Sequence, residues 1–373
     1  MQQAIYARLM VTPTETVERA AVLIEDGVIR AAGHREAIAI PADASCRDYG
    51  DAVLAPGLVD VHVHGGAGVD LMSAGAGEVA TLRRHLARHG VTSFLATTIS
   101  AEWDELMGAL ERLASAGLDI HMEGPFLSKE RRGVHPPETL REPSPAYLDE
   151  ICGRSNGRVR LITIAPELDG AEAFILEATR RGIRVSLGHS DANAEQARRA
   201  IQAGACHVTH TFNAMRPLHQ REPGLLGVAL TEAGLSAEII ADGIHVDPAL
   251  VKLFLRCKAP ESAVLASDGI SAAGMGDGNF HLGTVNVRVE GGACWCGSTL
   301  AGSVLTLDRA VKNVRACTGC SWDAAVRPAS QNPATLMKWA RKGRLEAGMD
   351  ADIAVFSPGG EITASYVGGK LVN

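Results

Sequence analysis

One unit recurs along the middle of this chain, and it constrains the fold more than any other feature. Each copy has a short β-branched or apolar run, a loop rich in Gly, His, Asp or Pro, and a segment of helical composition. The apolar runs are LVDVHVH (58–64), VTSFLATTI (91–99), IHMEGPF (120–126), VRLITIAPE (159–167), IRVSLGHS (183–190), HVTHTF (207–212), AEIIADGIH (237–245) and AVLASDGI (263–270). The helical segments include residues 77–89, 101–116, 171–181 and 193–203. This alternation of strand and helix predicts a (β/α)8 TIM-like barrel.

Both ends of the chain have β character instead. The segment 21–33 places apolar runs on either side of Asp26-Gly27, a dipeptide typical of β-hairpin turns, and residues 348–373 have the same composition. We therefore predict a small discontinuous β-sandwich domain built from both termini. Its predicted extent is residues 1–52 and 345–373, with the barrel at 53–344. Within the barrel, residues 274–297 predict a β-hairpin after the eighth strand, and 300–317 contain the helix that follows it.

Composition excludes several classes of protein. The chain has 373 residues, of which 46% are hydrophobic and 21% charged, as in a globular protein with a large core. A net charge of −7 provides no basic surface for nucleic acid. The sequence contains no apolar run of about 18 residues and no basic-then-apolar start, so we expect no membrane contact and a cytoplasmic location.

The eight cysteines are scattered through a long chain, which predicts reduced thiols rather than a disulfide framework. Cys294, Cys296, Cys317 and Cys320 could in principle form a thiolate zinc site. Their spacing resembles a structural zinc site only loosely, which favours ordinary small residues in a hairpin and a helix end.

Polar side chains gather where the predicted strands end. His62 and His64 are two apart on a strand, so their imidazoles point to the same face and can share one ion. Further candidates at strand ends are Glu123, His189, His210, His245 and Asp268. Catalytic residues of TIM barrels lie at the carboxyl ends of the strands, and imidazoles with a carboxylate are the ligands of catalytic zinc. Asp268 has the chemistry of a proton shuttle beside a metal. His207 is expected to be structural or to support a metal ligand.

Several longer motifs resemble the N-acetylglucosamine-6-phosphate deacetylase family of the amidohydrolase superfamily. They are APGLVDVHVHGG (55–66), HMEGPFLSKERRGVHPPE (121–138), SLGHSDA (186–192), THTFNAMRPLHQREPGLLG (209–227), ADGIHVDP (241–248), ASDGISAAG (266–274) and LAGSVLTLDRAV (300–311). Many amidohydrolases bridge two metals with a carbamylated lysine, but Lys129 is the only lysine between Val91 and His189 and falls in a loop. Glu123 is therefore the better bridging candidate, as in the resembled family.

The resemblance implies roles for individual residues. Glu123, His189 and His210 would hold a divalent metal, zinc above all, with iron, cobalt or manganese as alternatives. His62 and His64 would hold a second ion, and Asp268 would act as general base and then general acid. Substrate contacts are implied for Val134, His135, Asn213, Ala214, Arg221, His245, Leu300, Ala301 and Gly302. The family also implies a homodimer whose active site lies near the interface. Arg216 and His219 depart from the usual family pattern, so recognition of the phosphate or the sugar ring can differ in detail.

The implied activity is hydrolysis of the acetamide of N-acetyl-D-glucosamine 6-phosphate to D-glucosamine 6-phosphate and acetate. Three alternatives stay open at this point. The substrate could be another amino-sugar phosphate such as N-acetylgalactosamine 6-phosphate, or the enzyme could be a cyclic-amide hydrolase or deaminase. A non-catalytic barrel used for binding is the third, although every candidate ligand is present.

Overall fold

The computed structural model describes residues 2–12 and 14–372. Contacts divide the chain into two compact units. Unit 1 comprises Met1–Asp60, Arg83–Ser93 and Thr306–Asn373, and unit 2 comprises Val61–Leu82 and Phe94–Leu305. Within the described residues, no helix is long and apolar enough to cross a membrane.

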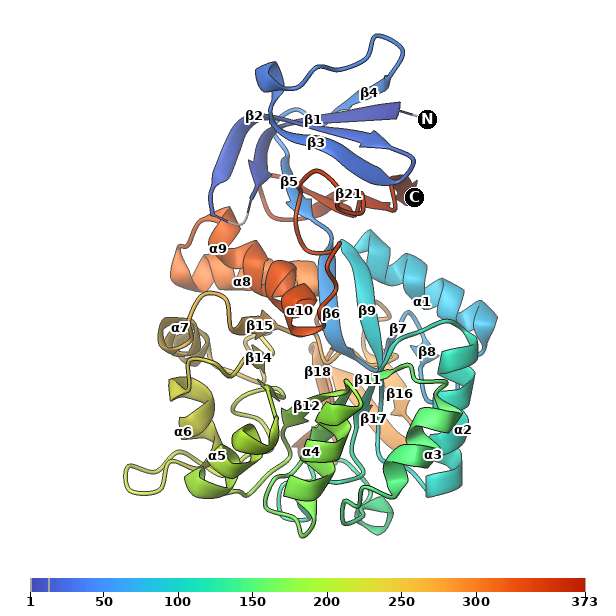
Figure 1. Cartoon of the computed structure of the whole chain (residues 1–373), viewed down its shortest axis with the longest axis vertical. Coiled ribbons are helices and arrows are strands. Elements are labelled where there is room, and N and C mark those ends of the chain that lie inside the picture. The colour runs from blue at the N-terminus through green and yellow to red at the C-terminus, as the bar shows by residue number, and fades with distance from the viewer. Residues whose placement is uncertain (1, 13, 373) are drawn as a thin grey trace. The chain divides into compact units, whose positions relative to one another are not determined.

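Unit 1 contains an eight-stranded sheet to which both ends of the chain contribute, blue and red in Figure 1. Its strands are β1 (Gln2–Val11), β2 (Thr16–Glu25), β3 (Val28–His34), β4 (Ser45–Asp48), β5 (Val53–Pro56), β20 (Ile353–Phe356), β21 (Ile362–Val367) and β22 (Lys370–Val372). Their order is β22-β21-β20-β5-β1-β2-β3, with β4 paired to β1. The antiparallel pairing of β20 with β5 joins the two ends of the chain. Both termini therefore supply strands to one β structure, as predicted.

The hairpin expected at Asp26-Gly27 is confirmed. Strands β2 and β3 pair antiparallel, and the two turn residues have φ values of 50° and 80°. Positive φ at both central residues is the signature of the tight hairpin turn that Asp-Gly favours. Along β1, Ile5 and Ala7 belong to one apolar cluster while Ala4 and Tyr6 belong to another. Both faces of this strand are therefore buried.

Eight parallel strands form the barrel, and each predicted run contains one of them. They are β6 (Leu58–Val63), β9 (Val91–Thr98), β10 (Ile120–Glu123), β11 (Val159–Ile164), β12 (Arg184–Leu187), β13 (His207–Val208), β14 (Ala237–Ile239) and β15 (Ala263–Leu265). Six pair in the order β6-β9-β10-β11-β12-β13, and β14 pairs with β15. Thr211 N–H donates to the Glu238 carbonyl beside β13, and Asp268 N–H donates to the His62 carbonyl beyond β15. These bonds link the two sheets into the closed ring of a TIM-like barrel.

The helices follow the strands as the sequence predicted. They are α1 (Ala76–Arg88), α2 (Trp103–Ser115), α3 (Tyr147–Arg154), α4 (Ala171–Arg180), α5 (Ala194–Ala203), α6 (Gly224–Thr231), α7 (Pro248–Cys257), α8 (Leu307–Thr318), α9 (Trp322–Val326) and α10 (Gln331–Leu336), with short 3-10 helices η1 (Arg35–Ala37), η2 (Pro137–Thr139) and η3 (Arg327–Ala329). Side-chain caps explain where two of these helices begin. Asn193 and Gln196 form a capping box at α5, and Asp247 caps α7 ahead of Pro248.

The predicted hairpin after the eighth strand is larger than expected. It is a four-stranded antiparallel sheet of β16 (Gly278–Leu282), β17 (Val285–Glu290), β18 (Ala293–Cys296) and β19 (Thr299–Leu300). A smaller hairpin, β7 (Gly65–Gly66) with β8 (Val69–Asp70), follows β6. The Asp70 carboxylate accepts the Gly283 N–H at 2.7 Å, which ties the small hairpin to the loop between β16 and β17.

The barrel interior is polar, unlike an ordinary core. All six residues of β6 are buried. The interior contains fully buried polar side chains from many strands, namely Asp60, His62, Thr97, His121, Thr163, Ser186, His207 and Glu238. Burying polar groups costs free energy unless they are hydrogen-bonded, so an interior of this kind indicates a site rather than packing alone.

Candidate metal centre

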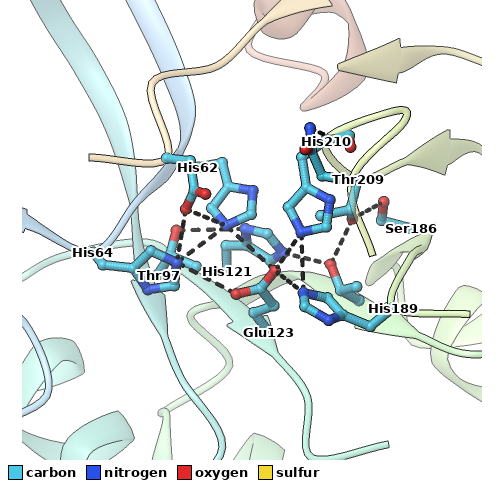
Figure 2. A network of polar contacts seen from close by, with 12 residues as sticks. His62, His64, Thr97, His121, Glu123, Ser186, His189, Thr209 and His210 are labelled. Atoms are coloured by element: carbon cyan, nitrogen blue, oxygen red, sulfur yellow. Dashed lines mark hydrogen bonds and ion pairs between the residues drawn. The ribbon is translucent and has the colours of Figure 1, made fainter. Parts of the chain in front are cut away.

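The six metal-ligand candidates converge, although they come from five separate strand ends. The structure brings them into two groups whose ligand atoms lie within 4.8 Å of one another. The first ligand group is His62, His64 and Asp268, and the second ligand group is Glu123, His189 and His210. All six residues are buried. The convergence at the carboxyl ends of the barrel strands is therefore observed, and Figure 2 shows the imidazoles turned toward one another around Glu123.

Glu123, at the end of β10, belongs to the second ligand group and also lies close to the two histidines of the first. Its Oε1 lies 3.2 Å from the Nε2 atoms of both His189 and His210. Its Oε2 lies 3.3 Å from His64 Nε2, and Oε1 is 3.5 Å from His62 Nε2. Both carboxylate oxygens can therefore be shared between two cations, as a bridging ligand requires.

Two of the histidines, His62 and His189, present Nε2 for metal binding. His62 Nδ1 donates to the Glu238 carboxylate at 2.6 Å, and His189 Nδ1 donates to the Arg131 carbonyl at 2.9 Å. A ring whose Nδ1 carries the proton keeps its lone pair on Nε2. The Nε2 atoms face one another at 3.2 Å for His62 and His64, and at 3.0 Å for His189 and His210. Converging lone pairs at these distances fit a divalent cation within each group.

The electrostatics of the cluster favour positive charge. Burial acts to raise the pKa of Glu123, but His62 and hydrogen bonds from His135, His189 and His210 outweigh it and hold the pKa well below the usual 4.5. Burial likewise acts to raise the pKa of Asp268, and the neighbouring His62 and His64 lower it on balance. Both carboxylates are therefore ionised beside the imidazoles, and the ionised form is the one that binds a cation.

Three of these side chains project into the centre from residues with a strained backbone conformation. His189 has a φ of 48°, His210 of 26° and Asp268 of 50°. Non-glycine residues rarely adopt this left-handed region, and such strain persists where the surrounding structure enforces it. At the first of these turns, a Cβ on the preceding Gly188 would meet the Thr209 side chain at 2.7 Å. The strand ends are therefore shaped for the site at some cost in conformational energy.

A hydrogen-bonded network lies beside the metal centre, and sequence reasoning missed its central member, His121. Figure 2 shows this ring among the ligands. Its Nε2 pairs with Thr163 Oγ1 at 2.8 Å, and its Nδ1 lies 3.1 Å from the Val61 carbonyl. Thr163 continues to Thr209 and then to Ser186. Burial lowers the pKa of His121 to about 3, so the ring is neutral and structural. An alternating strand pattern could have placed it inward, because His121 and Glu123 share one strand face.

The metal centre opens into a cavity of about 460 Å³, a volume typical of small-molecule sites. Its wall includes seven of the nine predicted substrate contacts, namely Val134, His135, Asn213, Ala214, His245, Leu300 and Gly302. Ala301 is fully buried behind the wall, and its N–H donates to the Cys294 carbonyl. Arg221 does not line this cavity and is exposed.

Two histidines of the wall have defined proton positions. His135 Nδ1 accepts the Ser100 N–H at 3.2 Å, and burial lowers the pKa of His135 to about 4. The neutral ring therefore carries its proton on Nε2, which lies 3.5 Å from Glu123 Oε2. His245 Nδ1 donates to Asp242 Oδ2 at 2.7 Å, which leaves Nε2 as the other polar atom of that ring.

The inserted four-stranded sheet also contributes to the wall. Leu282, Trp295 and Thr299 line the cavity, and none of them was predicted. Trp295 lies between two cysteines whose role the sequence left open. All eight cysteines are free thiols, and burial raises the pKa of Cys294 to about 12, so its thiol stays protonated. Neither ligand group contains a cysteine, and this segment contributes an aromatic side chain instead.

Comparison with known proteins agrees with this geometry. Residues 53–372 match the model of the Amidohydrolase family. The N-acetylglucosamine-6-phosphate deacetylase of Bos taurus is 39% identical over 349 residues, covering 87% of this chain and 85% of the relative. The N-acetylgalactosamine-6-phosphate deacetylase of Escherichia coli O157:H7 is 36% identical and covers 100% of both chains.

Solved structures give the same result. A mutant N-acetyl-D-glucosamine-6-phosphate deacetylase from Mycobacterium smegmatis, in complex with N-acetyl-D-glucosamine-6-phosphate, superposes with a TM-score of 0.95 at 34% identity. That match covers 100% of this chain and 99% of the other. The resemblance read from the motifs is confirmed, and the chain belongs to the amidohydrolase family.

Proposed function

We propose that this protein hydrolyses the acetamide of N-acetyl-D-glucosamine 6-phosphate to D-glucosamine 6-phosphate and acetate. One observation carries the proposal: five of the six members of the two ligand groups, Asp268 included, line one cavity of small-molecule size. The curated relatives named for this reaction span most of the chain, which supports the choice of substrate.

We propose that the two ligand groups hold one divalent ion each and share Glu123. Imidazole and carboxylate donors suit zinc, and they also suit iron, cobalt or manganese. When bound, such a cation polarises the acetyl carbonyl and lowers the pKa of water toward about 7. His62 and His64 would hold one ion, and His189 and His210 the other.

Asp268 is placed for the proton transfers. Its Oδ1 lies 3.2 Å from His64 Nε2 and 3.5 Å from His62 Nε2, at the wall of the cavity. It would accept a proton from the attacking water as the new carbon–oxygen bond forms. It would then deliver that proton to the amide nitrogen as the carbon–nitrogen bond breaks, which releases the amine and acetate.

His135 would stabilise the acetyl oxygen. Its neutral ring carries the proton on Nε2, beside Glu123 and facing the same cavity. A donor aimed at a developing oxyanion contributes about 3–4 kcal/mol to the lowering of the barrier.

The sugar phosphate would contact the remaining wall residues, among them His245, Asn213 and Ala214. Arg221 is exposed on its loop and lies outside the wall of its own chain's cavity. This placement supports a homodimer with the active site near the interface, in which Arg221 reaches a phosphate bound by the partner.

A second substrate has a specific observation in its favour. One relative that covers 100% of the chain is an N-acetylgalactosamine-6-phosphate deacetylase. The two sugars differ only in the configuration of one hydroxyl, so the same metal centre would serve either acetamide.

Two further proposals concern organisation and location. We propose that residues 1–52 and 345–373 form the small β-sandwich domain, which the presence of β1 to β4 and β20 to β22 in one sheet supports. The free thiols of all eight cysteines support a reducing compartment, and thus the cytoplasm.

Acetate release from a panel of substrates tests the function. We expect the metal-loaded protein to release acetate from N-acetylglucosamine 6-phosphate. A preference for the galactose isomer would select the second candidate. Ammonia or a ring-opened product in place of acetate would contradict both deacetylase proposals.

A further inference from the structure

Glu238 is a buried carboxylate for which the reaction above has no use. It lies on β14 and is 0% exposed, deep among the barrel strands. Burying an ionised carboxylate costs folding free energy unless other groups hydrogen-bond to it. The contacts of Glu238 show which groups do so.

The two oxygens of Glu238 reach three different strand ends. Oε1 accepts the His62 Nδ1–H at 2.6 Å and the His210 backbone N–H at 3.0 Å. Oε2 pairs with His207 Nε2 at 3.0 Å. One oxygen therefore contacts a member of the first ligand group and a member of the second.

The contact with His62 fixes a ring orientation. The ionised carboxylate can only accept, so Nδ1 carries a ring proton, and Nε2 is left as the ring atom that would bind a cation. The Nε2 atom then faces His64, Glu123 and Asp268 at 3.2, 3.5 and 3.5 Å. Carboxylate–imidazole pairs of this kind orient metal ligands and raise their basicity.

The contact with His210 fixes a strained turn. His210 has a φ of 26°, and its N–H is held by the Glu238 side chain. The next N–H, of Thr211, donates to the Glu238 backbone carbonyl at 2.8 Å. Two consecutive N–H groups of this turn are therefore held by one residue.

We propose that Glu238 is a positioning residue that couples the two ligand groups, holding the His62 ring directly and the His210 turn through its backbone. The inference rests on the metal centre of the proposed function but not on the identity of the substrate. His62 depends on Glu238 through its own ring, whereas His210 depends on it through the backbone alone. We therefore expect substitution of Glu238 to weaken metal binding at the first ligand group more than at the second.

The test compares Glu238→Gln with a matched control, His207→Gln. A glutamine keeps one acceptor oxygen, but that oxygen is neutral, so the charge-assisted hydrogen bonds to the His62 ring and the His210 N–H are weakened. The control changes only the partner of Oε2 and keeps a donor there. Both variants are titrated with Zn²⁺ and Co²⁺ against a chelator, with metal content by elemental analysis and the cobalt absorption spectrum as readouts.

We expect the unaltered protein and His207→Gln to hold two ions per chain. We expect Glu238→Gln to lower the affinity for one ion by about 10–100-fold, the usual range for loss of such a hydrogen-bond partner of a metal ligand. Glu238→Asp should restore part of the loss. Equal two-ion affinity in Glu238→Gln would overturn the proposal, and so would a single ion in the unaltered protein or an equal loss in the control.

A measurement on the unaltered protein keeps the proposal testable if Glu238→Gln does not fold. With ¹⁵N-labelled histidine and bound zinc, His62 should show a protonated Nδ1 with a strongly deshielded proton. An unprotonated His62 Nδ1 would overturn the proposal. Metal binding and acetate release are separate readouts, so failure of the substrate assignment leaves this test unaffected.

Discussion

The two ligand groups reach similar chemistry by different routes. In the first, His62 and His64 are supplied by one strand, because residues two apart share a face, and Asp268 comes from the last strand. In the second, each ligand comes from a different strand end, and two of the three sit in left-handed backbone. Local geometry pairs the two histidines of the first group, but Asp268 joins them only where the ring closes between β15 and β6, whereas the second group lies on strands of one continuous sheet. Sequence alone can therefore suggest the pair of His62 and His64, but tertiary structure completes both groups.

The largest expected effect comes from Asp268→Asn, which separates the role of Asp268 in proton transfer from its role as a ligand. The amide keeps an oxygen for the first ligand group but cannot accept a proton at neutral pH. We expect kcat to fall by about 10²–10⁴-fold, the usual contribution of general acid–base catalysis. Acetate release measures kcat, and elemental analysis with a melting curve checks that metal and fold are retained. A kcat near that of the unaltered protein would remove Asp268 from the proton transfers.

The next effect distinguishes the two groups directly. Replacing His62 and His64 together by Gln should remove the ion of the first group and leave one ion per chain. Replacing His210 by Gln should instead weaken the ion that Glu123 and His189 hold. Elemental analysis counts the ions, and acetate release ranks the two variants. Unchanged metal content in the double variant would reject the first group as a metal site.

A smaller effect concerns substrate recognition outside the metal centre. Arg221→Ala should raise KM for the phosphorylated sugar by about 10–100-fold, because a hydrogen bond between charged groups contributes about 1.5–3 kcal/mol. KM for unphosphorylated N-acetylglucosamine should change little. Gln220→Ala, at the exposed neighbouring position, serves as a control on the same loop. Equal effects on both sugars would contradict a phosphate contact.

The smallest effect is a pH dependence of the metal-free protein. Burial acts to lower the pKa of His64, but hydrogen bonds to Asp268 and Glu123 outweigh it and raise the pKa to about 9. A raised pKa stabilises the fold fully below the unfolded value of 6.5, and that stabilisation is lost as pH rises through about 9. We expect the Tm of the metal-free protein to fall between pH 6.5 and 9, and to fall less in His64→Gln. A Tm that rises over this interval would contradict the charge balance of the first group.

Much of the barrel could be predicted because its signals are local. Apolar runs predicted the eight strands, and the Asp26-Gly27 turn predicted the β2–β3 hairpin of unit 1. The ligands were predictable because polar residues at strand ends are conspicuous against apolar runs. Residues whose role depends on distant partners were not predictable.

Three residues illustrate that limit. Glu238 is one polar residue in AEIIADGIH, and only the closed barrel brings its carboxylate to His62, which is 176 positions away. Trp295 lines the cavity from β18 of a four-stranded sheet, where the sequence predicted only a hairpin. Arg221, predicted as a phosphate contact, lies outside the cavity wall because its loop is exposed in this chain. A motif identifies residue types, but it does not determine whether a loop residue lines the cavity of its own chain.

The most direct measurement is a crystal structure of the zinc-loaded protein with anomalous diffraction at the zinc edge. The account predicts two anomalous peaks per chain, one among His62, His64 and Asp268 and one among Glu123, His189 and His210, with Glu123 contacting both. Absence of any peak among Glu123, His189 and His210 would contradict it.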